Sequence, residues 1–147
     1  MRCVVIGLLL IAGCAGPHPS VEEGLDVKVE SWESVDVSGL NARIEDGVAA
    51  GATWPRSPLR LTVELLVSDV DTRAIWLTEE GNRGEVADTT VVTAVRDGFL
   101  DDSVRGDWQR IVYHRLGDGT WRVHEARRAY RCWRGHHLSA FSSQLCL

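Results

Sequence analysis

The feature that most constrains the fold is an alternation of apolar and polar side chains with a period of two residues. Segment 59–67 is the clearest example, because leucine and valine occupy its odd positions and polar side chains fill most of its even positions. A two-residue period places successive side chains on opposite faces of a β-strand. The same pattern predicts further strands at 25–32, 73–78, 86–96, 108–116 and 120–130.

Short turns join these segments, which favours an antiparallel sheet. Gly117-Asp118-Gly119 is a strong hairpin signal, and Ser68-Asp69-Val70-Asp71 is a polar link of hairpin length. Helical spacing occurs at Leu40, Ile44 and Val48, between a possible N-cap at Ser38 and a stop at Gly51. We expect an α+β domain, an antiparallel β-meander of about five to six strands with one short helix. Cystatin-like or nuclear-transport-factor-2-like folds fit this order, and a small open β-barrel is the alternative.

The start of the chain has the pattern of a targeting segment. Arg2 precedes an apolar run at 4–11, which is shorter than the roughly 20 residues that a membrane-spanning helix needs. The sequence Ile11-Ala12-Gly13-Cys14 resembles the lipobox of bacterial lipoproteins. The resemblance implies that residues 1–13 are a signal peptide and that Cys14 is lipidated. An ordinary secretory signal with an incidental Cys14 is the alternative.

The lipobox resemblance also implies a location and a domain plan. Several acyl chains, such as palmitate, would hold the protein on a membrane, since each buried CH₂ contributes about 0.8 kcal/mol. Residues 14–24 would be the lipidated cysteine and a polar tether, and 25–147 a single globular domain. We expect a lipid-anchored protein of the cell envelope. In a host with two membranes, Ala15 after the cysteine favours the periplasmic face of the outer membrane.

Charge excludes one class of partner. Without residues 1–13 the chain has 15 basic and 21 acidic side chains, a formal charge of −6, which argues against a nucleic-acid binder. The charge is uneven, because residues 105–134 contain eight arginines and only three acids. This basic segment could attract an anionic partner, or it could pair with the acidic strands of the same domain.

The cysteine count predicts one disulfide. Cys3 would leave with the signal peptide and Cys14 would carry lipid, so Cys132 and Cys146 remain in the domain. In an oxidising compartment they are expected to form a bridge, which closes the C-terminal segment into a loop. A reactive or metal-binding cysteine pair is the alternative, although the spacing is unlike that of a CxxC motif.

The C-terminal loop is the main candidate for binding. Its cationic, aromatic and imidazole side chains could bind anions, stack on sugar rings and donate hydrogen bonds. The candidate residues are Arg131, Trp133, Arg134, His136 and His137. In the alternative interpretation, the arginines of this region only cover tryptophans and pair with the acidic strands of the same domain. They are Arg127, Arg128, Arg131 and Arg134. Zinc ligation by the two histidines is a further alternative, but zinc needs three or four protein ligands.

Other residues carry weaker signals. Asp101 and Asp102 could bind a hard cation, although Asp and Ser are also ordinary turn residues. A serine, histidine and aspartate triad can be assembled on paper from Ser103, His114 or His136, and Asp101, but no catalytic motif supports it. We therefore expect neither an enzyme nor a cofactor. Four tryptophans on or beside predicted strands are expected in the core rather than on a ligand platform. They are Trp76, Trp108, Trp121 and Trp133.

A second resemblance covers about the last fifty residues. Asp101-Asp102-Ser103, Gly119-Thr120-Trp121, Arg134-Gly135-His136 and the two cysteines look like a pattern in small uncharacterised bacterial secreted or lipid-anchored proteins. It supports the bridge and the loop as one unit and implies no activity. The leading hypothesis is a non-enzymatic envelope lipoprotein that presents this loop to a protein or envelope-glycan partner. The alternatives are a metal- or small-molecule-binding periplasmic domain, in which His136, His137 and the Asp101-Asp102 turn bind the ligand, and a structural accessory without a ligand.

Overall fold

The computed structural model describes residues 27–67, 71–82, 84 and 86–147. The predicted signal peptide, Cys14 and the tether 14–24 lie outside these residues. So do the first two residues of the expected strand 25–32 and most of the expected link 68–71. Within the described part of the chain, no helix is both long and apolar enough to cross a membrane.

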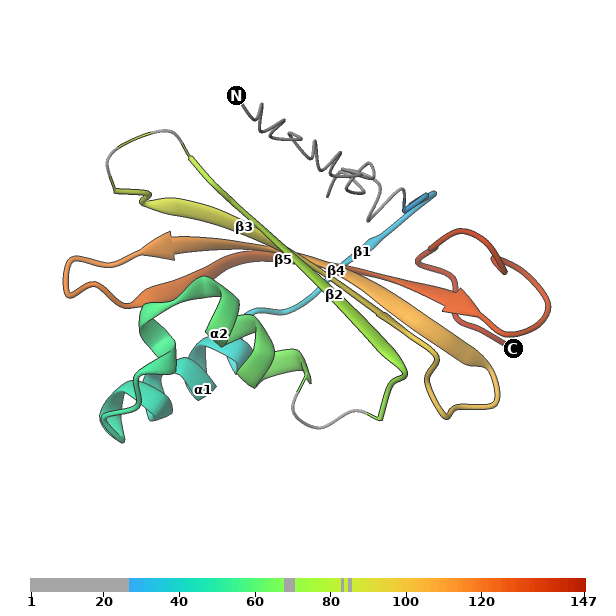
Figure 1. Cartoon of the computed structure of the whole chain (residues 1–147), viewed down its shortest axis with the longest axis horizontal. Helices are drawn as coiled ribbons and strands as arrows, with labels where there is room; N and C mark the ends of the chain where they lie inside the picture. Colours follow the sequence, from blue (N-terminus) through green and yellow to red (C-terminus); the bar gives the residue numbers. More distant parts are fainter. Residues whose placement is uncertain (1–26, 68–70, 83, 85) are drawn as a thin grey trace, which may run out of the picture.

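A five-stranded antiparallel sheet forms the centre of the domain, with helices against one of its faces (Figure 1). The strand order is β1-β5-β4-β3-β2, so β2 to β5 form the predicted meander. The barrel alternative is wrong, because β1 and β2 lie at opposite edges of an open sheet. The strands are β1 (Glu33–Ser34), β2 (Ala74–Gly81), β3 (Thr89–Asp97), β4 (Val104–Arg115) and β5 (Trp121–Cys132).

The strand expected at 59–67 is wrong, and the protein therefore has more helix than expected. A 3-10 turn η2 (Trp54–Arg56) leads into helix α2 (Pro58–Thr62), which continues as a π-helical turn η3 (Val63–Val67). Ser57 caps α2 by accepting a hydrogen bond from the Arg60 N–H, and Pro58 fits the first helical position. Buried Leu61 and Leu65 lie four residues apart, a spacing that satisfies one helix face as well as one strand face.

Helix α1 (Ser38–Ala49) confirms the expected helix but corrects its N-cap. Ser38 is already the first helical residue, and its side chain does not cap. Asp36 instead accepts hydrogen bonds from the Ser38 hydroxyl at 2.6 Å and the Ser38 N–H at 3.1 Å. These bonds hold the pKa of Asp36 below its usual value.

The expected first strand is largely replaced by short pairings at the sheet edge. Val29 forms an isolated parallel bridge with Phe141, and only Glu33–Ser34 pairs regularly with β5. Asn41, in α1, continues this edge with its side-chain amide, which donates to the Val123 carbonyl at 3.0 Å and accepts from the Val123 N–H at 2.9 Å. The side of β5 that faces away from β4 is therefore covered by several short partners.

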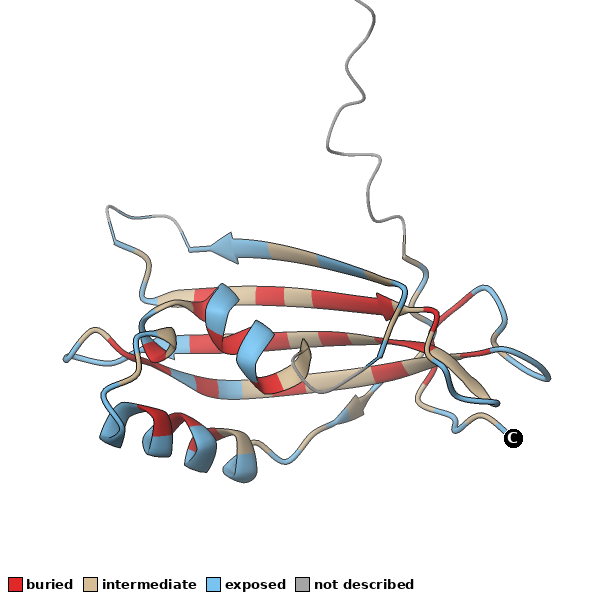
Figure 2. Cartoon of the chain, turned by 60° about the horizontal axis from the view of Figure 1, so that its bottom comes forward, coloured by how far each residue is buried: buried red, intermediate tan, exposed pale blue. Residues whose placement is uncertain are grey.

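The two faces of the sheet carry apolar clusters of different size. The face under the helices holds the main core, and buried residues alternate with less buried ones along much of β3, β4 and β5 (Figure 2). That core consists of Ile44, Leu61, Leu65, Val92, Ile111, Tyr113, Trp121, Val123 and Ala126. On the opposite face Val95, Ala129 and Phe141 form a smaller cluster, against which Val27, Val29 and Trp108 pack.

Candidate functional site

The predicted disulfide is present and closes the C-terminal loop. The Cα atoms of Cys132 and Cys146 lie 5.5 Å apart. Inside the loop, Phe141 is fully buried in the smaller cluster, and the N–H and carbonyl of Ser142 pair with the Tyr130 backbone at 2.9 and 2.7 Å. The loop is therefore fixed on the sheet by a covalent bond, an apolar side chain and backbone hydrogen bonds.

His137 is one of the predicted binding residues, and it lies inward as an anchor of the loop. Its Nδ1 lies 3.2 Å from a carboxylate oxygen of Glu30, and its Nε2 lies 3.0 Å from the side-chain oxygen of Gln144. Its backbone has a φ of 54°, a conformation that is uncommon for residues other than glycine. Both ring nitrogens are engaged within the domain, which leaves this imidazole little capacity for an external ligand.

Arg131 is also used within the domain. Its guanidinium lies 2.7 Å from Asp97 Oδ1 and stacks 4.8 Å from the centre of the Phe141 ring. Gly106 lies between Arg131 and Asp97 in the sheet, where a Cβ would collide with the Arg96 carbonyl. The glycine lets the ion pair cross β4 on the face opposite the helices.

Asp97 also pairs with Arg105, at 3.0 Å from Nε and 3.2 Å from a terminal guanidinium nitrogen. Burial alone would raise the pKa of Asp97, but hydrogen bonds and charge from Arg105 and Arg131 outweigh it and hold the pKa below its ordinary value. The carboxylate therefore stays ionised, and it fixes the base of the loop.

The other predicted binding residues face outward. Trp133 is 42% exposed, donates its indole N–H to the Phe99 carbonyl at 3.3 Å and lies beneath the Arg105 guanidinium. Arg134 and His136 are exposed, and neither forms a hydrogen bond or ion pair with any residue that the structure describes. Leu138 is exposed beside them. The loop thus exposes a guanidinium, an imidazole, an indole and an isobutyl group to solvent.

The two aspartates at 101 and 102 do not converge on a common site. Asp101 Oδ1 accepts backbone hydrogen bonds from Val104 at 2.6 Å and Ser103 at 2.7 Å, as a turn residue does. These bonds hold the pKa of Asp101 below its ordinary value. Among the described residues, no group of three or more His, Cys, Asp or Glu side chains is placed to hold a metal ion. His136 and His137 therefore do not belong to such a group.

The serine, histidine and aspartate combination is not assembled around His114. His114 lies near the end of β4, whereas Ser103 immediately precedes its first residue. A strand of that length spans roughly 35 Å. The ring of His114 instead stacks on His124, with 4.2 Å between the ring centres.

The tryptophans are divided between core and surface. Trp121 is buried in the main core, and Trp108 packs against the smaller cluster, as expected. Trp76 and Trp133 are exposed, so the expectation of core positions is wrong for these two. Trp32 is also exposed, with the Arg127 guanidinium 3.9 Å from its ring centre.

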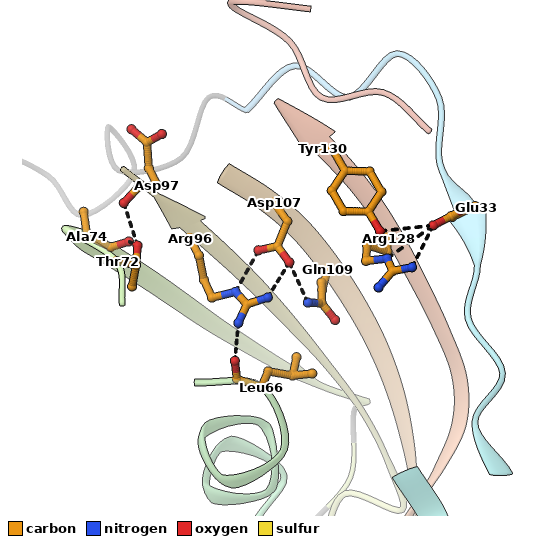
Figure 3. A network of polar contacts seen from close by, with 10 residues as sticks. All are labelled: Glu33, Leu66, Thr72, Ala74, Arg96, Asp97, Asp107, Gln109, Arg128 and Tyr130. Carbon is orange, nitrogen blue, oxygen red and sulfur yellow. Dashed lines mark hydrogen bonds and ion pairs between the residues drawn. The ribbon is translucent and has the colours of Figure 1, made fainter. Parts of the chain in front are cut away.

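A polar network on the helix side was missed by sequence reasoning (Figure 3). Arg96 binds Asp107 through two nitrogens at 2.8 and 2.5 Å and donates a further bond to the Leu66 carbonyl. Gln109 donates to the same carboxylate at 2.8 Å. The three polar side chains are buried and tie β3 and β4 to the end of η3. Arg96 and Asp107 lie at core-facing positions of their strands, which is the only signal that could have revealed them.

A comparison of the chain with family models, curated proteins and solved structures found no match.

Proposed function

We propose that this protein is a non-enzymatic lipoprotein of the cell envelope, anchored through Cys14, whose C-terminal loop binds a protein or envelope-glycan partner. One observation carries the proposal. Arg134 and His136 are presented outward, without hydrogen-bond or ion-pair partners among the described residues, by a loop that is held to the sheet at several points. A loop whose backbone is already fixed loses little backbone entropy on binding, which favours recognition.

The binding surface is smaller than the one expected from the sequence. Arg131 and His137 hold the loop in place, so the proposed contacts are Trp133, Arg134 and His136, with Leu138 at the margin. The combination suits a partner that offers anionic or hydrogen-bonding groups beside an apolar patch. Indole and guanidinium groups are common among residues that dominate binding energy at interfaces.

The position of the loop agrees with a membrane anchor at Cys14. Val27 packs on the face opposite the helices, and Glu30 contacts the loop through His137. A tether from Cys14 to residue 26 spans at most about 45 Å when extended. The anchor would therefore hold the domain within about 45 Å of the membrane, on the periplasmic face of the outer membrane in a host with two membranes.

The fold family also belongs to this proposal. One face of the twisted antiparallel sheet is covered by helices, and the helices precede the meander (Figure 1). Cystatin-like and nuclear-transport-factor-2-like folds have this arrangement in outline, and we propose that the domain is related to one of them. In this class of fold the function depends on the individual site rather than on the architecture.

Crosslinking in living cells tests the function. A photoreactive residue replaces Leu138 in the otherwise native chain, and crosslinked partners are identified by mass spectrometry. We expect one partner that is lost in an Arg134→Ala/His136→Ala variant and in a Cys14→Ser variant. As a matched control, Arg122→Ala removes another exposed arginine, at the far end of β5, and should keep the partner.

If the double variant keeps the same crosslinks as the native chain, the loop is not the binding surface. If only cell-wall glycan is captured, the partner is a glycan rather than a protein. If the Cys14→Ser chain remains membrane-bound and still gains palmitate label, Cys14 is not the lipidation site.

A further inference from the structure

The two edges of the sheet are treated differently by the rest of the chain. The free side of β5 is covered by β1, by Ser142 and by the side-chain amide of Asn41. In contrast, β2 pairs with β3 alone among the described residues, and Figure 2 shows it as the outermost strand of the sheet. Within the part of the chain that the structure describes, one side of the β2 backbone thus has no strand partner.

The free edge lacks most of the features by which edge strands usually avoid association. Natural edge strands are commonly protected by proline, charged side chains, a bulge or a short length. β2 has eight residues, contains neither proline nor lysine, and pairs with β3 without any register shift, and its charged side chains are confined to Glu79 and Glu80 near one end. It also exposes large apolar side chains, since Ile75 is 37% and Trp76 41% exposed.

The hydrogen-bond pattern shows which backbone groups face outward. The Asn82 N–H donates to the Thr89 carbonyl at 3.0 Å, so the even-numbered residues of β2 hydrogen-bond with β3. The odd-numbered residues Ile75, Leu77 and Glu79 then direct their N–H and carbonyl groups away from the sheet. These groups can pair with an added antiparallel strand.

We propose that β2 pairs with β2 of a second copy of this chain, around a two-fold axis that passes midway between the two Trp76 residues. This register sets Ile75 opposite Leu77 and Arg73 opposite Glu79, each pair occurring twice by symmetry. The two Trp76 side chains face each other at a non-hydrogen-bonded position, where cross-strand side chains are closest. The two domains then form one continuous antiparallel sheet.

Charge complementarity selects both the partner and the register. Arg73 and Glu79 are exposed, and neither has an ion-pair partner among the described residues. Shifting the axis to Leu77 would set Arg73 opposite Gly81 and Glu79 opposite Ile75, so both ion pairs would be lost. A second copy read antiparallel thus satisfies the cation, the anion and the apolar residues between them.

The arrangement is compatible with a common membrane surface. A two-fold axis perpendicular to the sheet keeps the helices of both copies on one face. Val27 of each copy lies on the other face, where the domain begins. Both chains would therefore leave the dimer on the same side, although the proposal does not depend on lipidation.

Cysteine crosslinking in cells tests the register. The proposed axis sets residue 74 opposite residue 78, with Cα atoms about 4.5 Å apart, within the range of a disulfide. Two differently tagged full chains, one with Ala74→Cys and one with Thr78→Cys, should form a mixed disulfide. Neither variant expressed alone should form a disulfide-linked dimer, because residue 74 does not lie opposite residue 74 and residue 78 does not lie opposite residue 78. Absence of the mixed disulfide, or equal crosslinking of either variant alone, would overturn this register.

Charge reversal tests the pairing without introduced cysteines. The full chain, purified in a mild detergent, is measured by analytical ultracentrifugation. Arg73→Glu should weaken the dimer about tenfold, because two ion pairs become repulsive. The double variant Arg73→Glu/Glu79→Arg should restore it, and the control Arg122→Glu should leave it unchanged. A native chain that stays monomeric at millimolar concentration, or a dimer unaffected by Arg73→Glu, would refute the proposal.

Discussion

The two faces of the sheet are stabilised by different kinds of interaction. On the helix side, α1, α2 and three strands enclose a continuous apolar core. On the opposite side, a small apolar cluster is supplemented by the disulfide and by the pairing of Asp97 with Arg105 and Arg131. The comparison indicates that the fold depends mainly on the first face, while the second face holds a loop in place.

The largest effect is expected in the core of the helix side. Ile111 is fully buried and lies between Val92 and Ala126 in the register of the sheet. Ile111→Ala removes buried methyl groups and leaves a cavity, so the free energy of unfolding should fall by about 2 to 5 kcal/mol. Urea denaturation of the full chain, followed by tryptophan fluorescence, measures it. The half-exposed Leu116 supplies a control, and Leu116→Ala should cost far less. An equal loss in both variants would contradict the assignment of the core.

The second-largest effect is expected from loss of the disulfide. It distinguishes the two faces of the sheet, because it should be confined to the face opposite the helices. Replacing Cys132 and Cys146 with alanine opens a loop with a sequence separation of 14. The free energy of unfolding should fall by roughly 3 kcal/mol on the chain-entropy account. Hydrogen exchange should become faster in residues 133–145 and stay slow in α1 and in the central strands. Loss of protection in α1 would show that the two faces are coupled.

The sheet was predictable from sequence because strand periodicity and turn chemistry agree from residue 73 onward. Segment 59–67 was misread for a physical reason. Its buried residues Leu61 and Leu65 are four apart, so they share a face in a helix and in a strand alike. Ser57 and Pro58 give a helix start there, and this signal outweighs the alternation.

The candidate loop was predictable in part. The cysteine count predicted the bridge, and composition identified the arginines and histidines of the loop. Which of them face outward could not be predicted, because that depends on residues distant in sequence. Arg131 meets Asp97 across β4, and His137 meets Glu30 from the start of the domain.

A smaller effect should depend on pH and arises on the face opposite the helices. The pKa of Asp97 is lowered in the folded protein, so its ion pairs stabilise the fold above the ordinary aspartate pKa. This contribution should disappear as the pH falls through the lowered pKa of the folded state. Asp97→Asn should therefore cost about 1 to 3 kcal/mol at pH 7, and progressively less as the pH falls below the ordinary aspartate pKa.

Urea denaturation at several pH values checks this difference between the native chain and the variant. Asp102→Asn is the control, because Asp102 is exposed in the neighbouring turn. A difference that is independent of pH would mean that the amide fails to pack rather than that the charge is lost.

The smallest effect on stability is expected at the residues proposed to bind a partner, and it sharpens the comparison within the loop itself. Arg134→Ala and His136→Ala should each change the free energy of unfolding by less than about 0.5 kcal/mol, as exposed substitutions do. Arg131→Ala should cost more, since it leaves Asp97 half paired and uncovers the Phe141 ring. Thermal denaturation of the three variants measures the contrast. Equal losses at all three positions would mean that Arg134 and His136 support the loop, and a binding role for them would then lose its basis. A loss confined to Arg131→Ala separates the residues that hold the loop from those free to contact a partner.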